Sequence, residues 1–322
     1  MKHILVTGGA GYIGAHTVHL LLRRGYEVTV VDDLSRGHRH NVAPDRLRIL
    51  PLADTDRLTE LLRSKPFEAV VHFAAYIAVG ESSREPEMYF TNNVSGSLSL
   101  FTAMARAQVS RLVFSSTAAV YGTPARVPIT EDMPIQPVSP YGDSKAMVEK
   151  ILGWLDQRRE LRSISLRYFN ACGAEPDSGL GEEHDPETHL IPLLLRAVET
   201  GHPITLFGDD YATPDGTCIR DYIHVSDLAE AHILALEHLI GGGASHAFNA
   251  GTGTGHSVLE VLRAVEQVTG EKVPHTMGPR RAGDAAVLVA DSNQLQSTLG
   301  WKPRYTDLRE IVRTAFEFAR KR

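Results

Sequence analysis

Short runs of β-branched and other apolar residues alternate with amphipathic stretches along the first half of the chain. This alternation is typical of βαβ units, in which helices join parallel strands and cover both faces of the sheet. We therefore predict strands over residues 4–7, 27–31, 48–51, 69–73, 112–116 and 164–168. Apolar residues at helical spacing predict helices over residues 13–24, 56–64, 86–107 and 140–157. The pattern indicates an α/β fold with a doubly wound parallel sheet.

The regular pattern ends near Asn170, where a polar stretch runs to residue 189. This stretch is too long for an ordinary connection, so we expect a functional loop. A smaller C-terminal α/β domain follows, with predicted helices over residues 190–200, 226–238 and 257–269. We divide the chain into a first domain, residues 1–170, and a mainly separate second domain, residues 171–322. Segments near 215–250, including the strand around Phe248, are predicted to return to the first domain.

A glycine-rich turn, TGGAGYIG, follows the first predicted strand and opens the first helix. Gly9, Gly11 and Gly14 have G-x-G-x-x-G spacing, in which the glycines allow a tight turn, close approach of a pyrophosphate and close helix–strand contact. Gly8 adds a further flexible position. Asp32 ends the next predicted strand, where a carboxylate can accept both hydroxyls of an adenosine ribose. The sequence therefore predicts a Rossmann-type domain that binds a dinucleotide.

Acidic residues after the second strand refine the choice of cofactor. Asp32 and Asp33 would repel a 2′-phosphate, which favours NAD over NADP. We expect Arg36 to form a solvated ion pair with these carboxylates. Asp54 has two interpretations: it caps the following helix, or it contacts the adenine.

A second group of residues is a candidate for catalysis. Tyr141 and Lys145 lie four residues apart at the start of a predicted helix and therefore share one face. We expect the ammonium group, together with a positive nicotinamide, to lower the pKa of Tyr141 and make it a general base. Thr117 follows a predicted strand at the carboxyl edge of the sheet, where its hydroxyl can hold a substrate oxygen. The three residues are the predicted catalytic group.

Composition narrows the function further. The chain carries 33 Lys and Arg against 39 Asp and Glu, a net charge of −6, which gives no support to a nucleic-acid or anionic-membrane partner. The two cysteines are too few for a disulfide framework and indicate a reducing compartment, so we expect a cytoplasmic protein. No apolar run is long enough for a signal peptide or a membrane span. His38 and His40 lack a metal-binding pattern, and no metal site is predicted.

Further motifs follow along the chain, namely FNACGA, HLIPLLL, GDDYATPDGTCIRDYIHVSDLAEAH, FNAGTGTGHSVLEV and PRRAGDAAVLVAD. With the glycine turn and the Tyr141/Lys145 pair, they resemble the extended short-chain dehydrogenase/reductase superfamily over essentially the whole length. Their order is similar to that in UDP-glucose 4-epimerases. The resemblance implies reversible C4 epimerisation of UDP-galactose and UDP-glucose through a 4-keto sugar and bound NAD. It also implies a homodimer formed by the helices at 86–107 and 140–157.

The resemblance assigns further site residues. Those expected to contact NAD are Gly8, Gly11, Tyr12, Ile13, Asp32, Asp33, Asp54, Phe73, Ala74, Ala75, Asn92, Ser115, Tyr141, Lys145 and Tyr168. Those expected to contact the nucleotide sugar are Thr117, Tyr121, Asn170, His189, Leu190, Phe207, Arg220, Arg281, Asp284 and Leu288. Arg220 and Arg281 are assigned to the diphosphate, whose oxygens match the planar guanidinium fork. Ile77 stands where certain epimerases place a lysine, so one basic contact to the cofactor phosphates is missing.

Other activities remain as alternatives. A 4,6-dehydratase or a uronate decarboxylase shares this fold, but dehydratases carry an acidic pair where this chain has Ala118 and Ala119. Elimination would therefore lack its proton carriers. A UDP-pentose 4-epimerase is a third alternative. A non-catalytic NAD-sensing protein is a fourth, although it would have no use for Tyr141 and Lys145.

Overall fold

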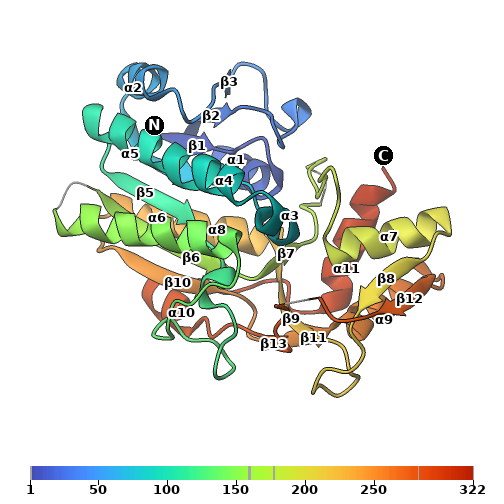
Figure 1. The fold of residues 1–322 in the computed structure, drawn as a ribbon. Coiled ribbons are helices and arrows are strands. Elements are labelled where there is room, and N and C mark those ends of the chain that lie inside the picture. The colour runs from blue at the N-terminus through green and yellow to red at the C-terminus, as the bar shows by residue number, and fades with distance from the viewer. Residues whose placement is uncertain (1, 159–160, 177, 282, 322) are drawn as a thin grey trace.

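The protein consists of a large parallel sheet with helices on both faces and a smaller α/β unit beside it (Figure 1). The computed structural model describes residues 2–158, 161–176, 178–281 and 283–321. The large sheet has seven parallel strands, in the spatial order β10 (His246–Ala250), β6 (Arg162–Tyr168), β5 (Arg111–Ser115), β4 (Phe67–His72), β1 (His3–Thr7), β2 (Glu27–Asp32) and β3 (Leu47–Ile49). The strand order reverses at β1 and β4, as in a doubly wound sheet. The predicted fold class is confirmed.

Alternating side chains of the strands divide the core between the two faces of the sheet. Ile4 and Val6 of β1 pack on one face in a cluster with residues of α1 (Tyr12–Arg23), α8 (Val225–Ile240) and α10 (Asn293–Leu299). Leu5 points to the opposite face, which is covered by α2 (Thr55–Arg63), α5 (Gly96–Arg106) and α6 (Pro140–Gln157). Because the strands are buried on both faces, their sequences are nearly continuous runs of apolar residues. The sheet is therefore a rigid platform for groups at its carboxyl edge.

The helix predicted over residues 86–107 is interrupted in the structure. It forms α4 (Pro86–Tyr89), a π-helical segment η2 (Phe90–Ser95) and α5. This wider π-helical turn contains Asn93, which is buried. The Asn93 side chain accepts a hydrogen bond from the backbone N–H of Tyr76 and donates one to the hydroxyl of Ser144. π-helical turns often occur at functional sites. Here the turn directs a polar side chain into the interior next to α6.

The smaller unit is built around a second apolar core. Three helices enclose it: α7 (Leu190–Thr200), α9 (Val258–Thr269) and α11 (Leu308–Ala319). Its strands are β8 (Ile204–Phe207) paired with β12 (His275–Gly278), and β9 (Ile219–His224) paired with β7 (Asn170–Cys172), β11 (Gly255–Ser257) and β13 (Val287–Leu288). Short helices η1 (Arg39–Asn41), α3 (Val79–Arg84) and η3 (Ala118–Tyr121) complete the described elements.

Two segments late in the chain pack on the large sheet. β10 pairs with β6 at the sheet edge, and α8 lies against the face that α1 also covers. The glycine-rich turn that follows β10 leads to Ser257, which forms a reciprocal capping box with Glu260 at the start of α9. Among the described residues, the structure contains no helix with the length and apolar character of a membrane span.

Candidate active site

The turn between β1 and α1 has the geometry of a dinucleotide cradle. Gly8 adopts a φ of 70°, and a Cβ atom there would lie 2.4 Å from the backbone nitrogen of Ala74. A Cβ on Gly14 would lie 2.2 Å from the carbonyl oxygen of Gly8. Gly11 caps α1 without a side-chain hydrogen bond, so the first N–H groups of the helix remain available to a phosphate. These backbone features fit a pyrophosphate group.

Asp32 is placed for the ribose side of the same cofactor. It ends β2, is buried, and accepts hydrogen bonds from the backbone N–H groups of Ala10 and Leu34, both at 2.9 Å. These bonds fix the carboxylate beside the glycine turn, and each oxygen retains acceptor capacity for a hydroxyl. Asp33 is exposed and accepts from Ser35. Together with the glycine turn, Asp32 makes this edge of the sheet suitable for NAD.

The structure gives Arg36 partners other than the expected ones, and it confirms one of the two interpretations of Asp54. Arg36 was expected to pair with Asp32 and Asp33, but its guanidinium lies 2.7 Å from a carboxylate oxygen of Glu81 and also bonds the carbonyl oxygen of Asp185. Asp54 accepts from the backbone N–H of Arg57 and caps α2, as its first interpretation states. The adenine contact of Asp54 stays a prediction.

The remaining cofactor candidates gather along the carboxyl ends of the strands. Phe73 donates its N–H to the carbonyl oxygen of Thr7, and Ala74 adjoins Gly8. Ser115 and Tyr168, at the ends of β5 and β6, share a hydrogen bond of 2.6 Å. Tyr12 and the half-buried Ile13 lie at the start of α1, and the Tyr12 phenol donates to the carbonyl oxygen of Gly173. Ala75 follows β4. Asn92 lies in the π-helical segment and donates to Asn93.

The predicted catalytic group comes together at the start of α6. Pro140 occupies the first turn, and the Ser139 side chain caps the helix, which fixes the direction of Tyr141. The Tyr141 phenol is buried and hydrogen-bonded to the side chain of Thr117. A base and a hydroxyl that share a hydrogen bond at the end of β5 can hold and deprotonate a substrate alcohol.

Burial shifts the pKa values of two residues of the predicted catalytic group. Burial raises the pKa of Tyr141, and the hydrogen bond with Thr117 lowers it by less. Lys145 donates to the carbonyl oxygen of Ser115 at 2.7 Å, and burial lowers the pKa of its amine to about 7 against the opposing charge of Glu149. The predicted lowering of the Tyr141 pKa depends on a positive nicotinamide as well as on the ammonium group, so it stays a prediction.

Tyr121 belongs to an internal hydrogen-bond network. Its hydroxyl donates to Asn249 and accepts from Arg167, each at 2.8 Å, and the side chain is buried. Arg167 is in turn paired with Glu149 at 2.6 Å. The network joins β6, α6 and β10. The assignment of Tyr121 as a substrate contact stays a prediction.

Five candidates for the nucleotide sugar lie on β8, β9 and β13 and on the segment between β12 and β13. Arg220 donates to the carbonyl oxygens of Ile219 and Ala285, and its guanidinium lies 3.7 Å from Asp284. Leu288 of β13 pairs in register with Arg220. Arg281 stacks over the ring of Phe207 with 4.5 Å between Cζ and the ring centroid. The structure therefore brings these five candidates, namely Phe207, Arg220, Arg281, Asp284 and Leu288, to one side of the smaller unit.

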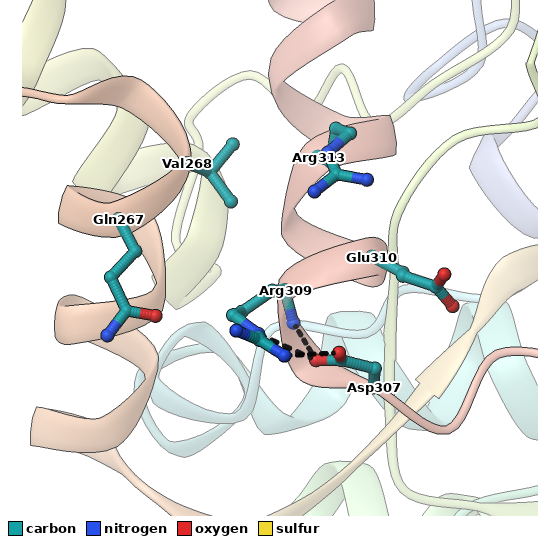
Figure 2. Close-up of a pocket in the computed structure, with 6 residues that line it drawn as sticks. All are labelled: Gln267, Val268, Asp307, Arg309, Glu310 and Arg313. Carbon is teal, nitrogen blue, oxygen red and sulfur yellow. Dashed lines mark hydrogen bonds and ion pairs between the residues drawn. The ribbon is translucent and has the colours of Figure 1, made fainter.

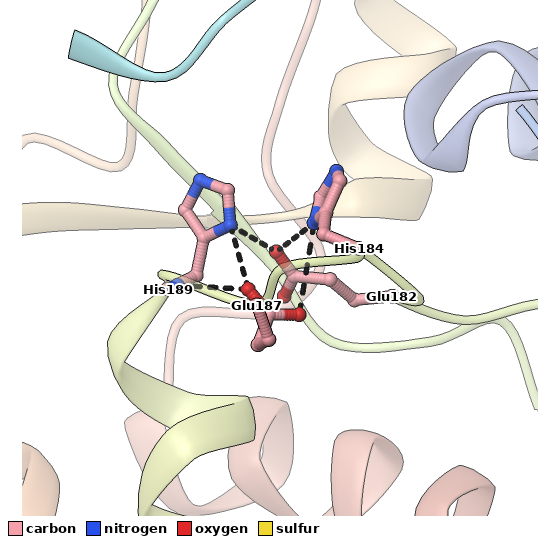
Figure 3. Close-up of side chains that lie close together, drawn as sticks. All are labelled: Glu182, His184, Glu187 and His189. Atoms are coloured by element: carbon pink, nitrogen blue, oxygen red, sulfur yellow. Dashed lines mark hydrogen bonds and ion pairs between the residues drawn. The ribbon is translucent and has the colours of Figure 1, made fainter. Parts of the chain in front are cut away.

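The last candidates lie at both ends of the polar stretch. Asn170 begins β7, and Leu190 begins α7 directly after His189. The His189 ring contacts Glu182 and Glu187 and lies close to His184 (Figure 3). Sequence reasoning missed the three partners of His189. The signal was the spacing of Glu and His in the segment GEEHDPETH.

A groove elsewhere in the protein carries none of the predicted residues. It has a volume of about 500 Å³ and lies between α9 and α11, lined by Gln267, Val268, Asp307, Arg309, Glu310 and Arg313 (Figure 2). The Arg309 guanidinium pairs with Asp307 at 2.9 Å. The groove is lined mainly by charged side chains in exposed positions, so we do not assign the reaction to it.

Known proteins of similar sequence and structure cover nearly the whole chain. The model of the NAD dependent epimerase/dehydratase family matches residues 4–251. A UDP-glucose 4-epimerase of Lactobacillus helveticus is 48% identical over 317 residues, which cover 98% of this chain and 96% of the relative. The UDP-glucose 4-epimerase from Brucella ovis in complex with NAD has a TM-score of 0.95, 45% identity and coverage of 98% of each chain. The enzyme from Bifidobacterium longum in complex with NAD+ and UDP has a TM-score of 0.93 and 36% identity, covering 99% of this chain and 98% of that chain.

These matches extend over both units of the fold. Two of them cover 98% of the chain, so they are not confined to the residues of the large sheet. The family model covers more than half of the chain, and the relatives match it over nearly its whole length. Both findings support the same family assignment. The chain belongs to the NAD dependent epimerase/dehydratase family and, within it, to the UDP-glucose 4-epimerases.

Proposed function

We propose that the protein interconverts UDP-galactose and UDP-glucose by inverting the configuration at C4 through a transient 4-keto sugar, with NAD as its bound cofactor. One observation carries the proposal: the Tyr141 phenol is held against Thr117 at the carboxyl edge of the sheet, next to a glycine turn that fits a dinucleotide. The names of the relatives supply the substrate class. Tyr141, Lys145 and Thr117 are the catalytic residues in this proposal.

Proton transfer is the step that this chain's own residues perform. Tyr141 takes the proton of the sugar 4-hydroxyl while Thr117 holds the same oxygen, and the proton returns from Tyr141 when C4 is reduced. NAD, when bound, supplies the acceptor of the C4 hydride. Lys145 lies one turn along α6 from Tyr141, and a ribose hydroxyl beside its amine would compete with the carbonyl oxygen of Ser115. The charge of Lys145 would then favour the phenolate form of Tyr141.

Inversion requires that the keto sugar present its other face while the nucleotide stays bound. Arg220 is anchored by two backbone carbonyl groups, and Arg281 is stacked on Phe207, so both guanidinium groups have defined positions. A diphosphate held by such groups leaves the sugar free to rotate about the linkage to phosphorus. The substrate-binding residues in this proposal are those given above, Tyr121 included.

Product analysis tests the proposal against its alternatives. We would incubate the protein separately with UDP-galactose, UDP-glucuronate and UDP-arabinose, and identify the products by mass spectrometry and NMR. Epimerisation leaves the mass unchanged and inverts C4. Loss of water would show a dehydratase, loss of carbon dioxide a decarboxylase, and no conversion an NAD-binding protein without this activity. Conversion of UDP-arabinose in preference to UDP-galactose would favour a pentose epimerase.

Leu288 is expected to limit the substrate range. It is half-buried, lies opposite Arg220 in the β9–β13 pair and packs against the cluster that contains Tyr121. A leucine leaves little room for a 2-acetamido group and cannot hydrogen-bond its amide, a loss of about 1–3 kcal/mol. We expect kcat/KM for UDP-glucose and UDP-galactose to exceed that for the N-acetylated sugars by about tenfold or more. Leu288→Ser should raise the N-acetyl efficiencies. Equal efficiencies in the wild type, or no gain in the variant, would show that another element sets the range.

We also propose a homodimer in which α5 and α6 form the interface. Leu98 on α5 and Met147 and Trp154 on α6 are exposed, with 60% of the Trp154 surface accessible, and both helices cover the same face of the sheet. Exposed apolar side chains grouped on one face favour a protein interface. Light scattering should give the mass of a dimer for the wild type and of a monomer for Trp154→Glu combined with Met147→Glu. Met277→Glu, at an exposed methionine of β12, is the control that should remain dimeric.

A cytoplasmic location is part of the same proposal. Cys172 and Cys218 are both free and buried. Unpaired cysteines fit a reducing compartment.

A further inference from the structure

Four side chains of the polar stretch between β7 and α7 converge on one point. They are Glu182, His184, Glu187 and His189, and one nitrogen or oxygen atom of each lies within 4.8 Å of the others (Figure 3). The Nδ1 atom of His189 is 2.9 Å from Glu182 Oε1 and 3.2 Å from Glu187 Oε1. The Nδ1 atom of His184 is 3.3 Å from Glu182 Oε1 and 3.7 Å from Glu187 Oε2. The acidic and imidazole groups therefore alternate around a common centre.

Two of these atoms are buried without a hydrogen bond. Glu182 Oε1 and His184 Nδ1 have no hydrogen-bond partner, although they lie only 3.3 Å apart, and only 6% of the Glu182 side chain is exposed. A buried carboxylate oxygen and a ring nitrogen in this state are costly unless another group satisfies them. The groups face one another at short range without hydrogen-bond alignment. That arrangement is the one adopted by ligand atoms directed at a shared cation.

The spacing of the ligand atoms sets the size of the cation. In a tetrahedral site with bonds of roughly 2.0–2.1 Å to nitrogen and oxygen, neighbouring ligand atoms are about 3.3 Å apart. The three separations that use a single atom of each residue, 2.9, 3.2 and 3.3 Å, lie close to this value, and the four ligand atoms all lie within 4.8 Å of one another. Imidazole nitrogen favours zinc and similar transition metals, whereas magnesium and calcium prefer sites made only of oxygen. The chemistry of the donors and their spacing agree.

We propose that Glu182, His184, Glu187 and His189 bind one divalent transition-metal ion of the zinc type. All four ligands come from the chain, so the site is structural and leaves no position for a reacting water. His189 is also a proposed substrate contact, but the metal proposal rests only on the geometry of this cluster, and its test measures zinc binding instead of epimerase activity. The competing explanation is a metal-free network in which protonated histidines pair with the two carboxylates.

The site would join the two units of the protein. Glu183, within the cluster segment, accepts a hydrogen bond at its carbonyl oxygen from His38, and the carbonyl oxygen of Asp185 accepts from Arg36. The His184 ring also packs edge-on against Tyr12 of the glycine turn, with 6.1 Å between the ring centroids. His189 begins α7 of the smaller unit. A metal ion in this position would fix the polar stretch between the dinucleotide half and α7.

Metal content of the full-length protein tests the proposal. We would strip the protein with a chelator, add zinc alone, and measure bound zinc after gel filtration, its affinity by competition with a chromogenic chelator, and the melting temperature. The wild type should bind one zinc ion per chain and melt at a higher temperature when zinc is present. Glu182→Gln and His184→Asn should each weaken zinc binding by at least about 100-fold and remove the rise in melting temperature. His40→Asn is the matched control, since His40 bonds Glu183 in the same segment but contributes no atom to the cluster.

Three outcomes would overturn the proposal. They are a wild type that binds no stoichiometric zinc, ligand variants that bind zinc as tightly as the wild type, and a control that loses zinc together with them. If the ligand variants do not fold, the wild type is loaded with cobalt(II) instead. Intense visible bands of a tetrahedral site that zinc then displaces would support the proposal. The weak spectrum of octahedral cobalt would contradict it.

Discussion

Tyr141→Phe is expected to lower turnover of UDP-galactose by roughly 10²- to 10⁴-fold, the usual contribution of a positioned general base. The phenylalanine keeps the buried ring but removes the hydroxyl that bonds Thr117. Because the lost group acts on the proton of the 4-hydroxyl, binding of UDP should change much less than turnover. The measurement is kcat in a coupled assay together with UDP affinity by calorimetry.

The pH dependence provides a second readout for the same variant. Burial raises the pKa of Tyr141, so the phenol is mainly protonated near neutral pH and the fraction of phenolate increases as the pH rises. Wild-type kcat should therefore increase with pH on the alkaline side, and the residual rate of Tyr141→Phe should lack this increase. Tyr89→Phe is the control: it also removes a buried phenol, one that bonds Ala78 and Glu81 and is not among the proposed site residues. A Tyr141→Phe rate above half that of the wild type would exclude Tyr141 as the base.

The large sheet was predictable because its signals are local. Each strand is a short apolar run, and each following helix repeats apolar residues at its own period, so both can be recognised without knowledge of their neighbours. The π-helical segment around Asn93 was missed because it depends on long-range partners, Tyr76 and Ser144. β13 was also missed. It is only two residues long and exists because Leu288 pairs with Arg220, which is distant in sequence.

The same distinction applies to the site. The glycine turn, Asp32 and the Tyr141/Lys145 pair carry spacing rules that arise within one βαβ unit or one helix turn. The partners of Tyr121, Arg167 and Asn249, come from strands far along the chain and could not be recognised from a local pattern. The burial that raises the pKa of Tyr141 is likewise a property of the folded protein. Sequence patterns therefore identified which residues come together, whereas the extent to which each side chain is buried could be determined only from the structure.

Arg220→Ala is expected to weaken UDP binding by about 2–3 kcal/mol, or roughly 30- to 150-fold in Kd. The Arg220 side chain is 12% exposed, and its guanidinium donates to the carbonyl oxygens of Ile219 and Ala285. A phosphate oxygen placed beside it would lose its charged donor in the variant without gaining access to water. Arg220→Lys should bind UDP with intermediate affinity, because an ammonium group lacks the planar fork that matches phosphate oxygens.

A comparison of Arg281 with its neighbour Arg280 tests whether UDP binding depends on the position of the arginine or only on its charge. Arg281 stacks on Phe207, whereas its neighbour Arg280 pairs with Asp210 and stacks on Tyr211. Arg281→Ala should weaken UDP binding, but by less than Arg220→Ala, since Arg281 is exposed and solvent screens its charge. Arg280→Ala should leave UDP binding unchanged. Calorimetry with UDP, after melting curves have shown that each variant is folded, measures all four proteins. Wild-type UDP affinity in Arg220→Ala would exclude Arg220 from the diphosphate site. If Arg280→Ala lost as much UDP affinity as Arg281→Ala, the general positive charge of this segment, and not a defined contact, would attract the nucleotide.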